Sequence, residues 1–311
     1  MTRLAGVDLG GTRLRAALAD EQGTILRRVE TLTERDGGAD RLVEQIYGVI
    51  QAAIGTDHIA CIGVGAPGPL NARTGVLYHP CNFTNDDIAL KELLEQRFGV
   101  PACVQNDANV AALGEWRFGG HGRTEHLVYI TVSTGVGMGI ISHGRLIDGF
   151  NTTAGEIGHT LIVPNGPECP WGHRGCVESI CSGTSIACMA QEGLRAGRES
   201  SLAGRVTAEL VAEAARQGDQ LAAEVFFRAA DTLGMAVVNV IHILSPEIVV
   251  IGGGVARAGA LLFGPVRARV RRDAMPATAA GVRIVPPGLG ADSGLVGAVT
   301  LAKDAMKTGG T

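Results

Sequence analysis

The sequence predicts an α/β fold with partly parallel β-sheets and a duplicated architecture. Apolar strand-like runs alternate with segments of helical spacing, which is the pattern of α/β proteins. Two regions follow one plan, a strand, a glycine-rich turn and a second strand: residues 4–19 around Gly10-Gly11 and residues 127–142 around Gly135-Val136-Gly137. No low-complexity linker separates the halves. We therefore expect two lobes that share a cleft.

Hydrophobic periodicity and turn residues place the individual elements. In the first half we expect strands at 4–9, 14–19 and from 25 onward, a helix at 40–54 with Asp40 as N-cap, a strand at 59–64 followed by the loop 65–69, a helix at 88–98, a strand at 102–105 and an alanine-rich helix to residue 115. In the second half we expect strands at 127–132 and 138–142, helices between 182 and about 244, strands at 247–251 and 282–285, and a terminal helix at 291–306.

Composition excludes several classes of protein. The 311 residues are 46% hydrophobic and 19% charged, which is typical of a globular chain. With 27 basic and 31 acidic residues, the net charge of −4 gives nucleic-acid binding no electrostatic support, and we interpret the basic cluster 267–272 as a solvated helix face. The opening residues lack the apolar core of a signal peptide, and no apolar run is long enough for a membrane span. We expect a cytoplasmic protein whose seven scattered cysteines are reduced.

Three glycine loops follow predicted strands. They are Asp8-Leu9-Gly10-Gly11-Thr12, the stretch from Thr131 to Gly139, and Gly252-Gly253-Gly254. None fits the dinucleotide fingerprint, and the chain contains neither a P-loop nor a nucleophile elbow, so Rossmann oxidoreductases, P-loop enzymes and α/β-hydrolases lose support. Backbone N–H groups in such loops can crowd an anion, so we expect phosphate binding.

Polar residues at strand ends suggest phosphoryl chemistry. Asp8 beside the first loop could be a turn residue or a ligand for Mg²⁺, which prefers carboxylates, phosphate oxygens and water. Thr12 and Thr134 offer hydroxyl groups at matching points of the two hairpins. Asn106-Asp107 ends a strand and starts a helix, so the aspartate is either an N-cap or a general base that accepts a hydroxyl proton. Gly155-Glu156-Ile157-Gly158-His159 and Glu178 supply groups suited to a polyhydroxylated substrate.

With these motifs in order, the sequence resembles the ROK family of sugar kinases (repressors, open reading frames, kinases), within the sugar-kinase/actin superfamily. The stretch from Val132 to His159 fits the family signature. The first glycine hairpin, Asn106-Asp107-Ala108-Asn109 and Ile251-Gly252-Gly253-Gly254 fit its other motifs, and the likeness runs from about residue 4 to 303. The resemblance implies a two-lobed sugar-kinase/actin-like (ribonuclease-H-like) fold with duplicated mixed β-sheets flanked by helices. The domains we expect are 1–107 plus 291–311, which is the smaller, and 108–290.

The resemblance also implies ATP-dependent phosphorylation of a hexose. By family analogy, Asp107 is the base that deprotonates the sugar hydroxyl. The residues that hold the sugar hydroxyls are Asn82, Asn106, Asp107, Glu156, His159 and Glu178. Asp8 serves Mg²⁺, while the phosphates and the nucleotide are bound by Gly10, Gly11, Thr12, Thr134, Gly135, Gly252, Gly253 and Gly254. Phosphoryl transfer requires much positioning and little covalent chemistry, so such groups suffice.

One segment departs from the family's zinc motif, a histidine followed by C-x-C-G-x-x-G-C. Here residues 169–176 read CPWGHRGC, so Trp171 stands where the second cysteine is expected. His159, Cys169 and Cys176 remain of the four ligands that a structural Zn²⁺ site takes. We expect zinc on these three, with water or His173 in the fourth place. The alternative is a loop held by Trp171 packing without metal.

Among sugars the resemblance favours glucose, giving a glucokinase. Glu156 stands where some N-acetylmannosamine kinases of the family have histidine, although residues 82–85 lack a tryptophan that many glucokinases place there. N-acetylmannosamine, N-acetylglucosamine, fructose and allose are alternatives within kinases. From other classes, a non-catalytic sugar-sensing protein remains, whereas a repressor is disfavoured because the first hairpin begins at residue 8. We expect a homodimer or homotetramer that contacts neither nucleic acid nor membrane.

Overall fold

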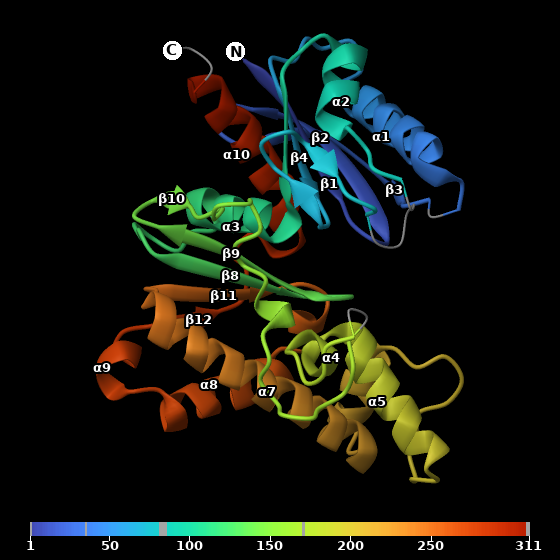
Figure 1. The fold of residues 1–311 in the computed structure, drawn as a ribbon, viewed down its shortest axis with the longest axis vertical. Coiled ribbons are helices and arrows are strands. Elements are labelled where there is room, and N and C mark those ends of the chain that lie inside the picture. Colours follow the sequence, from blue (N-terminus) through green and yellow to red (C-terminus); the bar gives the residue numbers. More distant parts are fainter. Residues whose placement is uncertain (1, 35, 81–85, 170–171, 309–311) are drawn as a thin grey trace. The chain divides into compact units, whose positions relative to one another are not determined.

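The chain forms two compact units (Figure 1). This computed structural model describes residues 2–34, 36–80, 86–169 and 172–308. Unit 1 contains Met1–Arg123, Gly139–Gly155 and Pro287–Thr311, and unit 2 contains Thr124–Met138 and Glu156–Pro286. Each unit is therefore assembled from separate stretches of sequence, and each is described by itself below.

The first sheet has the strand order β3-β2-β1-β4-β7. Its strands are β1 (Arg3–Leu9), β2 (Arg13–Asp20), β3 (Ile25–Leu32), β4 (Ile62–Ala66) and β7 (Ala102–Asn106). The first three strands pair antiparallel, and β4 and β7 then continue the sheet in parallel with β1. Because β1 and β7 point the same way, the loops that follow them leave the same edge of the sheet.

The second sheet repeats this plan in the order β10-β9-β8-β11-β12. Its strands are β8 (Leu127–Val132), β9 (Val136–Ser142), β10 (Arg145–Leu146), β11 (Ile248–Gly252) and β12 (Arg283–Val285). Strands β8, β11 and β12 are parallel, and β9 and β10 are antiparallel. The predicted duplication and the mixed α/β class are thus confirmed. A small two-stranded sheet, β5 (Leu70–Asn71) with β6 (Val76–Leu77), lies apart from both.

Helices cover both faces of the first sheet, because successive side chains of its strands point to opposite faces and apolar residues occur on both. Ala5, Val7 and Leu9 pack into the core shared with α1 (Gly38–Ile54), which runs beside α2 (Leu90–Phe98) in Figure 1. On the opposite face α10 (Ser293–Thr308) packs closely, since a Cβ on Gly63 would lie only 2.0 Å from the carbonyl oxygen of Ala298. Helix α3 (Asp107–Phe118) packs in turn on α10.

Unit 2 is largely helical outside its strands. Its longest helix, α7 (Gln220–Leu244), packs beside α8 (Ala260–Asp273), which carries the basic cluster 267–272 (Figure 1). The other elements are η1 (Ile157–His159), α4 (Glu178–Cys181), α5 (Gly183–Arg195), α6 (Ala208–Arg216), η2 (Val255–Ala258) and α9 (Pro276–Ala279), while η3 (Gly290–Asp292) precedes α10 in unit 1. Within the part of the chain that is described, no helix is long and apolar enough to cross a membrane.

Several boundaries differ from the sequence-based expectation. Helix α1 begins at Gly38 after Gly37, so Asp40 lies in its first turn and is not its N-cap. Strand β4 begins at Ile62, opposite Ala102 of its partner, and not at residue 59. The compact units also differ from the expected domains, because α3 and residues 139–155 belong with the first sheet. The physical reason is close helix packing: a Cβ on Gly297 of α10 would lie 1.8 Å from the Val110 carbonyl oxygen of α3.

Candidate active site

The junction of β7 and α3 carries the proposed base. Asn106 is the N-cap of α3, and its side-chain oxygen accepts hydrogen bonds from the backbone N–H groups of Ala108 at 2.9 Å and Asn109 at 3.4 Å. Asp107 is therefore the first helical residue and not the N-cap, and its carboxylate accepts from the Ala108 N–H at 2.8 Å. The positive end of the helix dipole stabilises a carboxylate there. Both residues are half-buried, so the junction offers a partly accessible carboxylate.

The hairpin between β1 and β2 forms the first glycine loop. The Gly10 N–H donates to the Arg13 carbonyl at 2.9 Å, and Thr33 donates its hydroxyl to the Gly10 carbonyl at 2.7 Å. Thr12 at the tip is exposed. Asp8 forms an ion pair with Arg15, its cross-strand neighbour. A guanidinium thus already neutralises the carboxylate that the family resemblance assigns to Mg²⁺.

Two further glycine loops meet in unit 2. Gly253 has a φ of 86°, and a Cβ there would lie 2.3 Å from the Val132 carbonyl oxygen, so only glycine lets the loop after β11 approach the end of β8. The turn from β8 to β9 occupies residues 133–135, where the Ser133 N–H donates to the Gly135 carbonyl at 2.9 Å. The structure therefore brings Thr134 and Gly135 into the same region as Gly252, Gly253 and Gly254.

The start of α5 joins these loops, and sequence reasoning missed it. The Gly183 N–H donates to the Ser133 carbonyl at 2.7 Å, and the Thr184 hydroxyl donates to the Thr134 carbonyl at 3.0 Å. The helix N-terminus is thereby docked on the glycine turn, and the positive end of a helix dipole favours an anion nearby. The available signal was Ser182-Gly183, since Ser182 caps α5 by accepting from the Ser185 N–H at 3.1 Å.

The sugar-binding candidates of unit 2 lie beside the same hairpin. The Glu178 carboxylate accepts from the Val136 N–H at 2.9 Å. The nearest oxygen of Glu156 lies 3.8 Å from Nε2 of His159. Burial raises the pKa of Glu156; the imidazole of His159 opposes that shift and the charge of Glu178 adds to it. Two carboxylates and an imidazole therefore share one neighbourhood, which suits hydrogen bonding to several hydroxyl groups.

Glycine again makes this arrangement compact. A Cβ on Gly158 would lie 2.2 Å from the Val136 carbonyl oxygen, so η1 can pack on the start of β9 only without a side chain. Asn106, Asp107 and the first hairpin belong to unit 1, whereas the other described candidates belong to unit 2. Asn82, the remaining candidate, lies outside the described residues.

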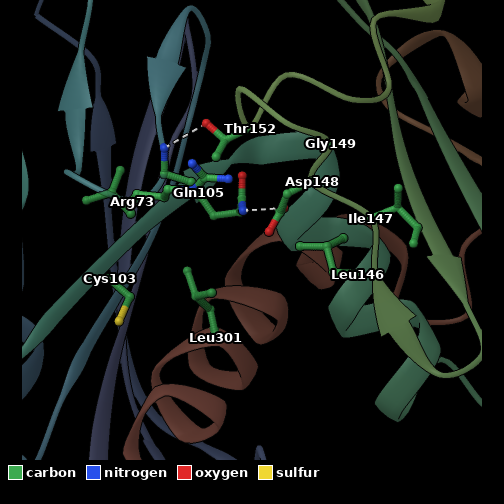
Figure 2. A pocket seen from close by; sticks show the side chains of 11 residues that line it. Arg73, Cys103, Gln105, Leu146, Ile147, Asp148, Gly149, Thr152 and Leu301 are labelled. Carbon is green, nitrogen blue, oxygen red and sulfur yellow. Dashed lines mark hydrogen bonds between the residues drawn. The ribbon is translucent and has the colours of Figure 1, made fainter. Parts of the chain in front are cut away.

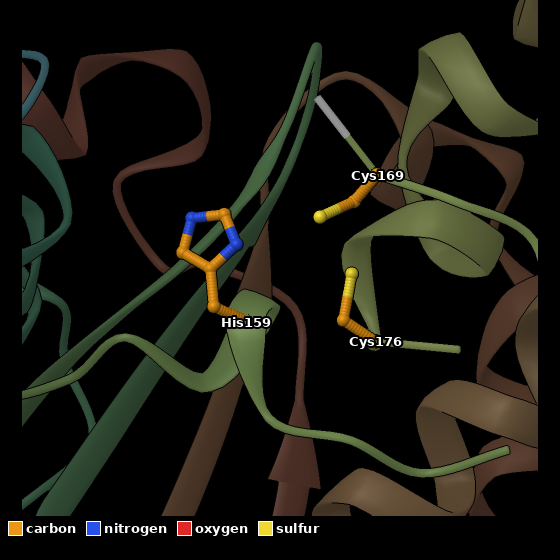
Figure 3. A group of neighbouring side chains, drawn as sticks. All are labelled: His159, Cys169 and Cys176. Carbon is orange, nitrogen blue, oxygen red and sulfur yellow. The ribbon is translucent and has the colours of Figure 1, made fainter. Parts of the chain in front are cut away.

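Three candidate zinc ligands come together within unit 2. Figure 3 shows the side chains of His159, Cys169 and Cys176 turned toward one another, and one ligand atom from each lies within 4.8 Å of the others. Zinc bonds of about 2.0–2.3 Å place tetrahedral ligand atoms about 3.5–4 Å apart, so a small contraction would fit one ion. Both cysteines are buried. His173 is exposed and is not in this group, and Trp171 lies outside the described residues.

Duplicated β-sheets with glycine hairpins at their strand ends define an actin-like ATPase fold, as found in sugar kinases. The ROK family model matches residues 4–305. The chain belongs to the ROK family. It is 37% identical to a glucokinase of Thermotoga maritima over 97% of this chain and 98% of that protein. It is 38% identical to a glucokinase of Halalkalibacterium halodurans over 96% of this chain and 94% of that protein.

A solved structure resembles the chain equally well. The ROK family glucokinase of Streptomyces griseus, crystallised with glucose and AMPPNP, superposes with a TM-score of 0.85 at 32% identity, covering 97% of this chain and 99% of that one. The likeness therefore covers residues of both compact units.

Proposed function

We propose that this chain is an ATP-dependent glucokinase that transfers the γ-phosphoryl group of ATP to the 6-hydroxyl of glucose. The observation that carries the proposal is its near full-length similarity to glucokinases, one of them solved with glucose and an ATP analogue. As a hexose kinase it is a phosphotransferase of class EC 2.7.1. Asn106-Asp107 at the start of α3 supplies the partly accessible carboxylate that such a reaction requires.

Each candidate residue has a proposed role in that transfer. Asp107 accepts the proton of the sugar hydroxyl as its oxygen attacks the γ-phosphorus, and the bond from that phosphorus to the bridging oxygen of ADP breaks. Glu156, His159 and Glu178, with Asn82 and Asn106, hold the remaining hydroxyl groups. The glycine loops, with Thr12 and Thr134, hold the phosphates and the nucleotide through backbone N–H and hydroxyl groups.

Two metals belong to the proposal. Mg²⁺ would accompany ATP and neutralise phosphate charge, with Asp8 as the protein carboxylate in exchange for its present partner Arg15. Zn²⁺ would be structural, held by His159, Cys169 and Cys176, and would fix the imidazole so that its other nitrogen can face the sugar. The convergence of the three ligand atoms supports the zinc site.

A sugar panel tests the function. ADP release should be measured with glucose, fructose, allose, mannose, N-acetylglucosamine and N-acetylmannosamine, and glucose should give the highest kcat/KM. A higher value with an N-acetylhexosamine would reassign the substrate. Sugar binding without ADP release would favour a non-catalytic sugar sensor. A homodimer or homotetramer and a cytoplasmic location are proposed from the sequence alone, to be tested by light scattering and cell fractionation.

Replacement of the base tests the mechanism. Asp107→Ala should lower kcat by at least about 100-fold, the usual size of a general-base contribution, while glucose binding falls far less. Asp40→Ala is the matched control, because Asp40 is also an aspartate in the first turn of a helix but lies exposed on α1. Turnover of Asp107→Ala within a few-fold of wild type would contradict the assignment.

A further inference from the structure

Gln105, the residue before Asn106-Asp107, is buried and makes several hydrogen bonds. The Gln105 side chain is only 4% exposed. Its oxygen accepts from the Asn106 backbone N–H at 2.7 Å and from the Asn109 side-chain amide at 3.2 Å. Its nitrogen donates to the Asp148 carboxylate at 2.9 Å (Figure 2). One amide thus fixes the first turn of α3 and joins it to the segment after β10.

That segment, residues 147–155, is tightly held within unit 1. Thr152 is buried with a φ of 62°, and its hydroxyl oxygen accepts from the Ala72 N–H at 3.1 Å. Arg73 donates to the Phe150 carbonyl at 2.9 Å, and the Ala154 N–H donates to the Asp148 carbonyl at 3.0 Å. The segment leads directly in sequence into Glu156, a proposed sugar ligand. Gln105 therefore connects the helix that carries the base to the stretch that precedes this ligand.

The surroundings of Asp148 explain why the contact matters. Asp148 lines a pocket of about 540 Å³ together with Gln105, Arg73, Cys103, Thr152 and Leu301 (Figure 2). Burial raises the pKa of Asp148, whereas the Gln105 hydrogen bond and the charge of Arg73 act against that shift. Because water solvates this carboxylate poorly, the amide of Gln105 is one of its main partners, and a poorly compensated buried charge is costly.

The direction of the amide is also fixed by these contacts. Both partners of the Gln105 oxygen are donors, and an ionised carboxylate can only accept. The amide therefore has one orientation that satisfies all its partners, and Asp148 is what holds the nitrogen on the pocket side. The two donors to the oxygen and the carboxylate that accepts from the nitrogen therefore all favour the same orientation of the amide.

We propose that Gln105 is a positioning residue of the kinase reaction, whose amide, oriented by Asp148, sets the Asn106-Asp107 turn and ties it to residues 147–155. The role of the turn rests on the proposed function, whereas the mechanical link does not. Gln105 itself touches neither reacting atom. Its loss should lower kcat more than it raises KM, since displacements of about 1 Å can cost about 100-fold in rate.

Exchanging the amide of Gln105 and the carboxylate of Asp148 tests the proposal. Gln105→Leu removes the link, and Gln105→Glu sets two carboxylates against each other; both should lower kcat by about 10–100-fold with KM values for sugar and ATP within about threefold of wild type. Asp148→Asn still accepts from Gln105 and should retain most activity. The double variant Gln105→Glu/Asp148→Asn reverses the donor and acceptor and should recover kcat to within about fivefold of wild type.

Gln96→Glu is the matched control. Gln96 also donates its amide to a carboxylate, that of Glu92 at 3.0 Å, but on the exposed surface of α2, so its replacement should leave kcat unchanged. Hydrogen exchange gives a readout independent of activity. Gln105→Leu should speed amide exchange at residues 105–112 and 147–155 together, and the control should not. Only variants whose far-UV circular dichroism spectrum matches that of the wild type are compared.

The outcomes separate this proposal from the proposed function. A wild-type protein that phosphorylates no sugar would remove the glucokinase assignment, and coupled exchange in the two segments would still support the link. Wild-type kcat in Gln105→Leu would overturn the positioning role. So would a double variant no faster than Gln105→Glu, or exchange that rises in one segment only.

Discussion

Glu115→Ala should destabilise unit 1 by about 3–5 kcal/mol, because it removes a fully buried carboxylate that accepts several hydrogen bonds. The Glu115 side chain is 0% exposed on α3. It accepts from the backbone N–H groups of Gly288 at 2.8 Å and Leu289 at 3.0 Å, and from the Ser293 hydroxyl at 2.7 Å. Nε2 of His121 lies 2.6 Å from Oε2 of Glu115, the oxygen that also accepts from Gly288. Alanine would leave these donors without their acceptor, and one of them, the Ser293 hydroxyl, is buried.

The magnitude follows from the number and kind of these contacts. A hydrogen bond to a charged group contributes about 1.5–3 kcal/mol, and a buried donor left unsatisfied costs about 1–3 kcal/mol. Three donors would give more than the expected total if they were additive, but water entering the space left by the side chain satisfies part of the loss. Glu115→Gln keeps one acceptor oxygen and should lose about half as much. Since domains are stable by only about 5–15 kcal/mol, either change should be easy to measure.

Urea unfolding provides the assay. Circular dichroism and the fluorescence of Trp116, the neighbour of Glu115, should both be followed, because a chain of two units can unfold in more than one step. The midpoint should fall without a change in slope. Glu213→Ala is the control, since its ion pair with Arg216 is exposed on α6 and such pairs contribute about 0–1 kcal/mol. A loss below about 1 kcal/mol in Glu115→Ala would refute the reasoning.

Three further expectations concern metal, packing and pH. Protein purified without a His tag should hold about one zinc per chain by elemental analysis. Cys176→Ser should lose the zinc, and Cys188→Ser, which changes an exposed cysteine, should keep it. Less than about one-fifth of a zinc per chain, with full activity after chelation, would indicate a loop that is stable without metal. Gly297→Ala should cost about 1–3 kcal/mol in urea unfolding by overpacking α3, while Gly264→Ala, which faces open space on α8, should gain about 0.5–1 kcal/mol. Hydrogen bonds lower the pKa of Asp219, and the largest effect comes from the backbone N–H of Ala222 in α7. The stabilisation that Asp219 contributes to the folded state is therefore present above about pH 4 and is lost as the pH falls. Asp219→Asn should reduce the loss of stability at acid pH, and an unchanged loss would contradict this.

The duplicated arrangement of strands could be predicted because its signals lie close together in the sequence. Each glycine hairpin lies between two apolar strands, so periodicity and turn chemistry sufficed to predict both hairpins. The cap of α3 was less predictable, since Asn106 and Asp107 are both good N-cap residues and only the geometry shows that Asn106 takes the position.

Hydrogen-bond partners that are distant in the sequence could not be predicted from local sequence patterns. Gln105 reads as one polar residue in a strand, and its importance arises from Asp148, which is 43 positions away in sequence. The sequence shows Glu115 only as a helix end, because three of its hydrogen-bond donors lie 173 to 178 positions further along the chain. The close packing of α3 on α10 likewise depends on glycines in both helices, and the sequence does not show that these two helices meet.

The place of α10 in the chain has a consequence for biosynthesis. This helix completes the interior of unit 1 against β1 and β4, yet a ribosome makes it after all of unit 2. From the end of β7 at residue 106 to Ala302 in α10, about 200 residues must be added, which takes about 10–40 s at about 5–20 residues per second. During that interval the nascent sheet exposes one apolar face, including Leu4 and Ala19. We expect chaperones to hold this face during translation, and kinase activity to follow only after the last helix has docked.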